Sequence, residues 1–220
     1  MTGFADTFLN AAVMARALPS IAWGLVLTIE LALLIVVTGL ITGLALALVR
    51  MAGLRPLNWL IVFVVDLFRA VPPLVIIVLL YFGAPAFELT PSGFFCTWLS
   101  LSAVLMAFAE EIYWAGLTAI PVGQWEAARS TGLGFGAALR HVILPQALRI
   151  VIPPLTNRTI AITKGTALGS VVAVGEILSQ ATSAMSFSGN PSPLTLGAAA
   201  YLILFLPVVV AGRWIERRFR

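Results

Sequence analysis

The chain has 220 residues, of which 60% are hydrophobic and 10% are charged, and its formal net charge is +4. Soluble domains are about 45–50% apolar and about 25% charged, so this composition excludes a water-soluble fold and predicts an all-α membrane protein. One cysteine and one histidine exclude a disulfide scaffold and a thiol- or histidine-based metal centre.

Five apolar runs are each long enough to cross a membrane as a helix, which takes about 20 residues. We therefore predict a single transmembrane domain over 1–220, with about five transmembrane helices and no separate soluble domain. The runs occupy roughly 21–49, 57–82, 97–120, 150–181 and 195–212.

The arginines predict how the chain is oriented. The connections at 83–96 and 182–194 contain no Lys or Arg, and the N-terminal segment contains only Arg16. The positive-inside rule then places a segment 1–20 in the periplasm and a tail 213–220 in the cytoplasm. The net positive charge thus reflects topology and anionic lipid, not nucleic acid. The basic residues of the cytoplasmic side are Arg50, Arg55, Arg129, Arg140, Arg149, Arg213, Arg217, Arg218 and Arg220.

The first run contains a packing motif and a costly charge. Gly39 and Gly43 have the GxxxG spacing that lets a second helix approach closely. Glu30 would cost roughly 2.5–3.5 kcal/mol at the centre of the bilayer. We therefore expect Glu30 to face protein or water, or to lie near the outer interface.

The second run ends in charges and prolines. Asp66 and Arg69 are three residues apart, so they share a helix face and can pair. Pro72 and Pro73 are expected to kink or break the helix, which is tolerated at membrane depth only against protein or a water-filled cavity. Two interpretations stay open: a structural kink with a local ion pair, or a cavity wall where Arg69 offers its charge to a solute.

The third run carries two adjacent carboxylates, Glu110 and Glu111. Neighbouring side chains point about 100° apart on a helix, so these two are not expected to act as a paired acid and base. We expect one to face the transport path and the other to contact a neighbouring subunit or the interface. Tyr113 and Trp114 fit an aromatic belt.

A polar interruption at 121–149 separates the third and fourth runs. We predict two short helices, one at 124–129 and one at 135–142, with a turn at Gly132 where a positive φ is available. Glu126 and Arg129 are spaced to brace the first helix. Alanines 127 and 128 are small enough to enter a groove on a partner. A helix lying on the membrane surface would need a longer apolar face.

The fourth run does not resemble a simple lipid-facing helix. It contains Pro153-Pro154, Arg158 and Lys164. We expect much of it to line the protein interior, with Arg158 snorkelling near the cytoplasmic interface. Residues 182–194 are expected to form an outward loop.

Several of these motifs resemble the permease subunits of polar amino acid ABC importers, the family with a cytoplasmic EAA loop. The resemblance covers about 20–218. Its matching residues are Arg69 with Pro72, Glu111, Gly123-Gln124 with Glu126-Ala127-Ala128, Val142 to Ala147, Pro153 to Asn157, and Lys164 with Thr166 and Leu168.

The resemblance implies a type I importer-like fold in the bacterial inner membrane and a translocation path shared with a second permease subunit. It also implies a cytoplasmic ABC ATPase dimer, an external solute-binding protein and an amino acid substrate. The implied ATPase-docking residues are Glu126, Ala127, Ala128, Gly132, Leu144 and Pro145. The implied substrate path contains Arg69, Pro72, Glu111, Lys164 and Thr166.

The same resemblance implies no catalytic residue, metal or cofactor in this chain, because ATP belongs to the partner ATPase. No GxxxxGK[ST] phosphate loop is present. The chain departs from the family where Trp114 replaces the usual Arg, where Ala70-Val71 follow Arg69, and where Gly165 and Ala167 flank Thr166. These departures leave the solute open, and whether the second subunit is identical or different.

Two other functions are weighed against the importer. An ion-coupled secondary transporter could use Glu30, Asp66, Glu110 and Glu111 as titrating groups, but no clear internal repeat is present and the 121–149 segment would have no role. An intramembrane hydrolase would need a nucleophile elbow, which the sequence lacks.

Overall fold

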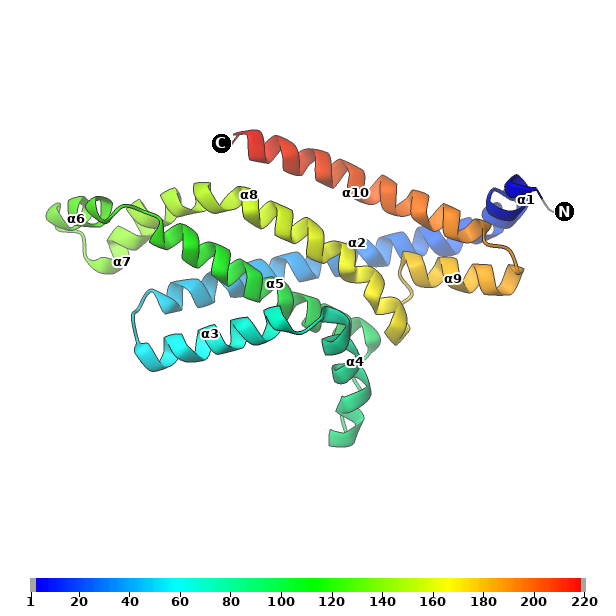
Figure 1. Ribbon diagram of the computed structural model, residues 1–220, viewed down its shortest axis with the longest axis horizontal. Coiled ribbons are helices and arrows are strands. Elements are labelled where there is room, and N and C mark those ends of the chain that lie inside the picture. The colour runs from blue at the N-terminus through cyan, green and yellow to red at the C-terminus, as the bar shows by residue number, and fades with distance from the viewer. Residues whose placement is uncertain (1–2, 219–220) are drawn as a thin grey trace.

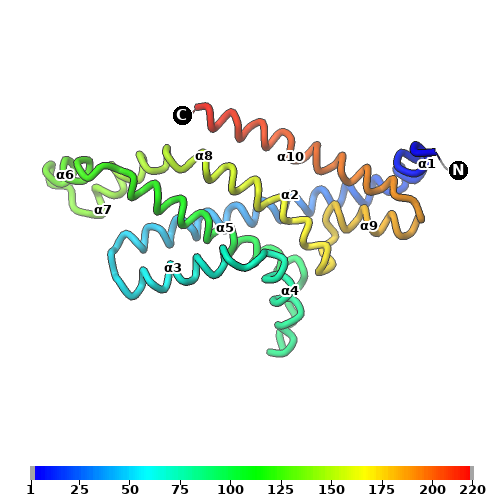
Figure 2. Tube along the Cα trace, viewed as in Figure 1, coloured from blue at the N-terminus to red at the C-terminus, as the bar shows by residue number. Residues whose placement is uncertain are grey.

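The computed structural model describes residues 3–218, and these form an elongated bundle of α-helices (Figure 1). Residues 1–2 and 219–220, including Arg220 of the predicted tail, lie outside the described residues. The N-terminal end, with the α9–α10 connection, lies at one end of the long axis. The segment with α6 and α7 and the turn between α2 and α3 lie at the other end (Figure 2).

The first long helix is longer than the apolar run that predicts it. After the short α1 (Phe4–Phe8), α2 extends from Ala11 to Arg50 and passes through Pro19. Asn10 caps its start, because its side-chain oxygen accepts a hydrogen bond from the Val13 N–H at 3.1 Å. Residues 11–20 of the predicted N-terminal segment therefore belong to α2. Glu30 is exposed on this helix.

The prolines at 72–73 break the second run, as predicted. α3 spans Arg55–Ala70 and α4 spans Pro73–Gly83, followed by the 3-10 turn η1 (Ala84–Phe87). The two parts are bent by 98°. As a result, α4 points away from the long axis of the bundle (Figure 1).

The central helix α5 (Gly93–Thr118) packs against α2, α3, α4 and α8. A Cβ built on Gly39 would lie 2.8 Å from the Leu105 Cβ, and one built on Gly43 would lie 2.7 Å from the Ala109 Cβ. Real Cβ atoms do not approach so closely. The predicted close packing at the two glycines is therefore confirmed, and the helix that they admit is α5.

The interruption after α5 forms helices and leads directly into a span. α6 covers Val122–Ser130, and α7 covers Phe135–Ala138. The π-helical η2 (Leu139–Ile143) then joins α8 (Leu144–Thr163) without a break. The two short helices are confirmed, but Leu144-Pro145 begins the long helix and does not close a loop.

The fourth run differs most from its prediction. Its helix begins well before residue 150, continues through Pro153 and Pro154, and ends as the 3-10 helix η3 (Lys164–Val172). The predicted loop at 182–194 is wrong, because α9 occupies Ile177–Ser188 and α10 begins at Ser192 and runs to Arg218. Gly189, with φ +62°, ends α9 in the left-handed conformation that favours glycine.

Four stretches are long and apolar enough to span a membrane: Phe4–Arg50, Gly93–Thr118, Phe135–Val172 and Ser192–Arg218. The bent α3–α4 pair makes a fifth if it is counted as one span. The predicted all-α class and the count of about five are confirmed.

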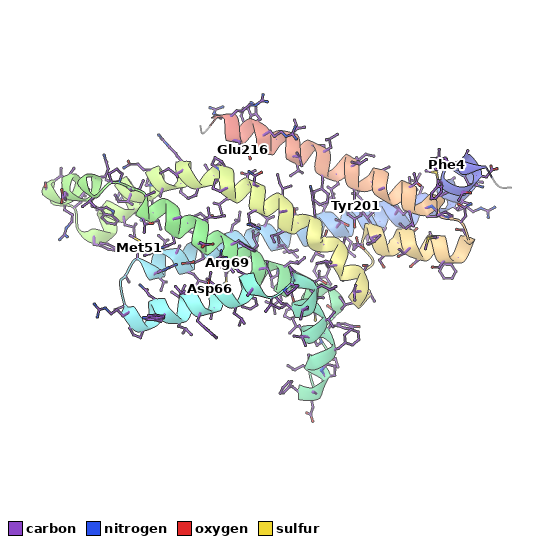
Figure 3. The ribbon with its side chains drawn as sticks, in the orientation of Figure 1. Phe4, Met51, Asp66, Arg69, Tyr201 and Glu216 are labelled. Atoms are coloured by element: carbon purple, nitrogen blue, oxygen red, sulfur yellow. The ribbon has the colours of Figure 1, made fainter. Side chains whose placement is uncertain are left out.

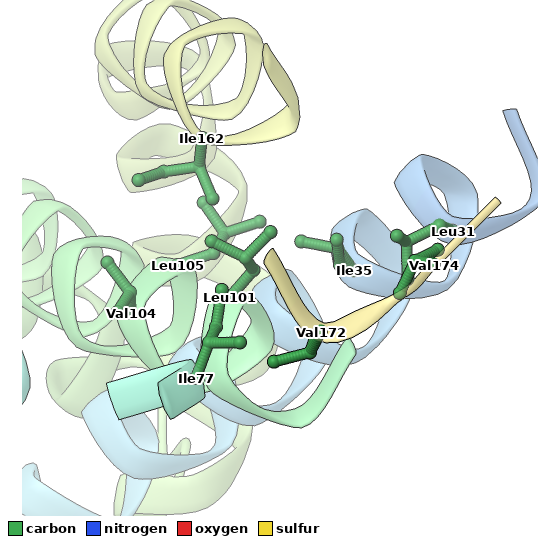
Figure 4. Close-up of a cluster of buried hydrophobic side chains, with 9 residues drawn as sticks. All are labelled: Leu31, Ile35, Ile77, Leu101, Val104, Leu105, Ile162, Val172 and Val174. Carbon is green, nitrogen blue, oxygen red and sulfur yellow. The ribbon is translucent and has the colours of Figure 1, made fainter. Parts of the chain in front are cut away.

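The two largest buried apolar clusters among the described residues both include α5. One joins α2, α4, α5 and η3, and includes Leu31, Ile77, Leu101 and Val172 (Figure 4). The other joins α5 to η2 and α8 nearer the α6 end, and is described with the site below.

Candidate functional site

The Glu126-Ala127-Ala128 motif lies in the second half of α6, at one end of the bundle (Figure 1). Glu126 and Ala127 are exposed. Ala128 is only 6% exposed, so its side chain is buried within this chain and is not offered to a partner. The expectation that both alanines are available on the surface therefore holds only for Ala127.

Contacts within the chain fix the position of α6. The Trp125 and Phe135 rings stack with their centroids 5.2 Å apart. The Gln146 side chain donates a hydrogen bond to the Gln124 side-chain oxygen at 3.3 Å. Gly132 has φ +86°, as predicted for the turn after the helix. The predicted brace between Glu126 and Arg129 is wrong, because the ion pairs among residues 3–218 do not include it.

A buried apolar cluster connects this end to the membrane helices. Ile143, in η2, is fully buried among Tyr113 and Leu117 of α5 and Val151 of α8. Leu144 packs at the edge of the cluster, and Pro145 is exposed. Because close-packed interiors transmit displacement, a push on α6 would move α5 and α8 with it.

Arg69 connects two carboxylates from two helices. Its Nη2 lies 2.7 Å from the Glu111 Oε2, and its Nη1 lies 3.4 Å from the Asp66 Oδ1. Arg69 and Asp66 are labelled in Figure 3. The predicted pairing of Asp66 with Arg69 is confirmed. The two charges expected to bind a solute, Arg69 and Glu111, are paired with each other in this conformation.

Glu110 points to a different helix, as adjacent helical positions require. It is fully buried, and its Oε1 accepts a hydrogen bond from the Arg50 Nη1 at 3.0 Å. The Arg50 guanidinium also lies 4.2 Å above the Trp114 ring. The expectation that one of the two carboxylates contacts a neighbouring subunit or the interface is therefore wrong for Glu110, because its partner is at the end of α2.

Arg158 also contacts α5. Its guanidinium lies 3.8 Å above the Phe108 ring, and that of Arg69 lies 5.5 Å from the same ring. Arg158 thus packs against α5.

The remaining residues of the implied substrate path lie in different surroundings. Pro72 is exposed between α3 and α4, and Lys164 is exposed where α8 continues as η3. Thr166 is fully buried, and its hydroxyl donates to the Thr163 carbonyl at 2.9 Å. α4 packs against η3.

Sequence reasoning missed a buried carboxylate that starts α9. Glu176 is fully buried; its oxygens accept hydrogen bonds from the N–H groups of Leu178 at 2.9 Å and Ser179 at 2.7 Å, and from the Tyr201 hydroxyl. Ala173 just before it adopts φ +60°, an uncommon conformation for a residue with a side chain. Gly175 before and Gly189 after this helix were the available sequence signals.

These features agree with a comparison to known families. The model of a family described as "binding-protein-dependent transport system inner membrane component" matches residues 35–220. The chain belongs to this family.

Curated relatives in the family are named as amino acid permeases. The chain is 30% identical to the arginine transport system permease protein ArtQ of Bacillus subtilis, over 92% of this chain and 94% of that protein. It is 35% identical to the probable glutamine ABC transporter permease protein GlnM of the same organism, over 81% and 83%. It is 37% identical to the L-cystine transport system permease protein TcyB, also from Bacillus subtilis, over 74% and 70%.

Solved structures show the same fold. A chain from the crystal structure of an amino acid ABC transporter with histidines is 32% identical, with a TM-score of 0.85 over 93% of this chain and 96% of that one. A chain of the inward-facing MetNI methionine ABC transporter is 21% identical, with a TM-score of 0.70 over 96% and 99%, and supports the fold alone. The predicted importer fold is confirmed, and nothing in these comparisons supports the ion-coupled alternative.

Proposed function

We propose that this chain is the permease subunit of an ATP-driven importer for a polar amino acid or a related small zwitterion. Relatives named for arginine, glutamine and cystine transport, and the 32% identical transporter structure, support this substrate class. The observation that carries the coupling role is the exposed Glu126–Ala127 surface on α6, which is fixed to the membrane core through Ile143.

In this proposal the chain hydrolyses no ATP and needs no cofactor of its own. A cytoplasmic ATPase dimer binds ATP and receives α6, with Glu126 making polar contacts and Gly132 and Pro145 lying at the edge of the docking surface. Rigid transmission through α5 and α8 then alternates the opening of a path shared with a second permease subunit. An external binding protein delivers the solute.

The Arg69–Glu111 pair is the proposed solute contact. The side chains of Arg69 and Glu111 are 32% and 46% exposed, so separating the two charges costs little. A zwitterion replaces both partners, since its carboxylate pairs with Arg69 while its ammonium pairs with Glu111. Asp66 keeps Arg69 oriented during the exchange. Lys164, Thr166 and the break at Pro72 form the adjoining wall.

The proposed orientation in the bacterial inner membrane places the N-terminus outside and the C-terminus in the cytoplasm. The exposed arginines 55, 140 and 149 support it. Arg55 begins α3 after the α2–α3 turn, and Arg140 and Arg149 lie in η2, which contacts α6, and in the first part of α8.

A charge reversal tests the docking surface. Glu126→Lys should leave membrane insertion and thermal stability unchanged, because Glu126 is exposed and unpaired with Arg129. Loss of about 1.4 kcal/mol of docking free energy would lower ATP-driven uptake about tenfold. Uptake is measured in proteoliposomes containing the co-purified ATPase, permease partner and binding protein.

Glu216→Lys is the matched control, since it makes the same charge change near the end of α10, away from α6. Normal uptake by Glu126→Lys would contradict docking through α6. Uptake that needs no ATP and collapses with an ionophore would support the secondary transporter instead.

Thermal stabilisation of the binding protein by one amino acid would identify the solute.

A further inference from the structure

A cavity at the turn between α2 and α3 combines two cations with two aromatic walls. Its volume is 330 Å³, within the range of about 300–1,000 Å³ typical of ligand clefts. It lies at the end of the bundle that carries α6, where Met51 marks the turn (Figure 3). Its lining residues are Arg50, Arg55, Asn58, Trp59, Val62 and Trp114.

The cavity has more positive than negative charge. Glu110 pairs with Arg50 and holds it against Trp114. Arg55 is exposed, and the ion pairs found within residues 3–218 do not include it. One guanidinium at the mouth is therefore available for an anion.

The surroundings favour a lipid over a soluble phosphate. Trp59 is 77% exposed, and Leu60 and Phe63 continue an exposed apolar surface along α3. Tryptophan is enriched at the level of lipid headgroups, and acyl chains can cover the apolar residues beyond it. Basic pockets between helices on the cytoplasmic side are suited to anionic headgroups.

We propose that this cavity binds the phosphate of an anionic phospholipid headgroup. Arg55 contacts the phosphate, and Trp59 and Trp114 flank the headgroup. This also gives a role to Trp114, the position where the chain departs from the family pattern. The site is separate from the proposed transport path, but it rests on the proposed orientation, which puts this end of the bundle in the cytoplasm.

Native mass spectrometry of the full chain in its detergent-solubilised complex tests this site. The complex is titrated separately with phosphatidylglycerol, phosphatidic acid, phosphatidylcholine and inorganic phosphate. We expect phosphatidylglycerol and phosphatidic acid to be retained in preference to phosphatidylcholine, with binding about fivefold weaker in Arg55→Gln, as one interfacial arginine contributes.

Arg213→Gln is the matched control, because Arg213 is also an exposed arginine beside a tryptophan, near the end of α10. Equal losses in Arg55→Gln and Arg213→Gln would show diffuse surface charge and overturn the site. Equal retention of phosphatidylcholine would also overturn it. Displacement of the lipid by inorganic phosphate at matched concentration would identify a free phosphate as the ligand and contradict the lipid.

Discussion

The chain contains the same Pro-Pro pair twice within its membrane helices, and the two pairs have opposite effects. At Pro72-Pro73 the backbone before the pair is extended, with ψ 129° at Val71, and the helices on either side are bent by 98°. At Pro153-Pro154 the helix α8 continues unbroken. The local chemistry is identical, because each proline fixes φ and removes one N–H donor.

The buried contacts made by the residues next to each proline pair account for the difference. Beyond Pro73, the fully buried Ile77 packs against Leu101 and Val172, off the axis of α3. Around Pro153, Val151 and Leu155 are both buried in the cluster that joins α8 to α5. The first set of contacts requires a turn, and the second requires a continuous helix.

A diproline therefore permits a break, and tertiary contacts decide whether one forms. Two other helix ends show that a proline is not needed to interrupt a helix in this chain. Gly132 turns the chain after α6, and Glu176 starts α9 after η3.

Of the changes proposed here, truncating Ile77, the buried residue of α4, should lower the unfolding free energy most. Ile77→Ala should cost about 2–5 kcal/mol of unfolding free energy, because it leaves a cavity in a packed cluster. Leu79→Ala in the same helix is the control, since Leu79 is 66% exposed. Unfolding in detergent mixtures measures both. Equal losses would mean that Ile77 does not hold the bend.

Replacing a proline by alanine restores a backbone N–H donor, and the effect should differ between Pro72-Pro73 and Pro153-Pro154. Pro154→Ala returns an N–H to the middle of α8 and should stabilise the protein by up to about 3 kcal/mol. Pro73→Ala should change little, because Pro73 is the first residue of α4, where the N–H has no helical partner. Spin labels at exposed positions 63 and 79 report the bend by their distance. A straightened α3–α4 in Pro73→Ala would refute the dominance of tertiary contacts.

Glu176 starts α9 without a proline, and removing its side chain should lower the stability by less than removing Ile77 does. Glu176→Ala removes the side-chain cap of α9 and should cost about 0.5–2 kcal/mol, as measured by thermal unfolding. Glu176→Gln keeps one acceptor oxygen and should recover part of the loss. If the two variants are equally stable, capping by Glu176 contributes nothing.

Much of the site could be predicted from local sequence. The pairing of Asp66 with Arg69 follows from three-residue spacing, and the turn at Gly132 follows from glycine's access to positive φ. The close helix approach at Gly39 and Gly43 follows from their missing side chains. Each of these depends on residues that are near one another in the chain.

The partners of the two glutamates could not be predicted in the same way. Glu110 pairs with Arg50, which is 60 positions away, and Glu111 pairs with Arg69 on another helix. The Tyr201 partner of Glu176 was hidden for the same reason, since it lies 25 positions further along, whereas the bonds by which Glu176 caps α9 are local. Helix rotation and tilt bring these groups together, and a one-dimensional pattern does not specify either.

The sequence by itself determined that the chain is a helical membrane permease of an importer family, because composition, span length and the Glu126-Ala127-Ala128 segment are local properties. Only the tertiary structure decided which prolines break a helix, which motif residue is buried and where each buried charge finds its partner. The physical reason is that hydrocarbon-length helices satisfy their own backbone, so their bends and pairings are set by side-chain contacts between segments that are distant in the chain.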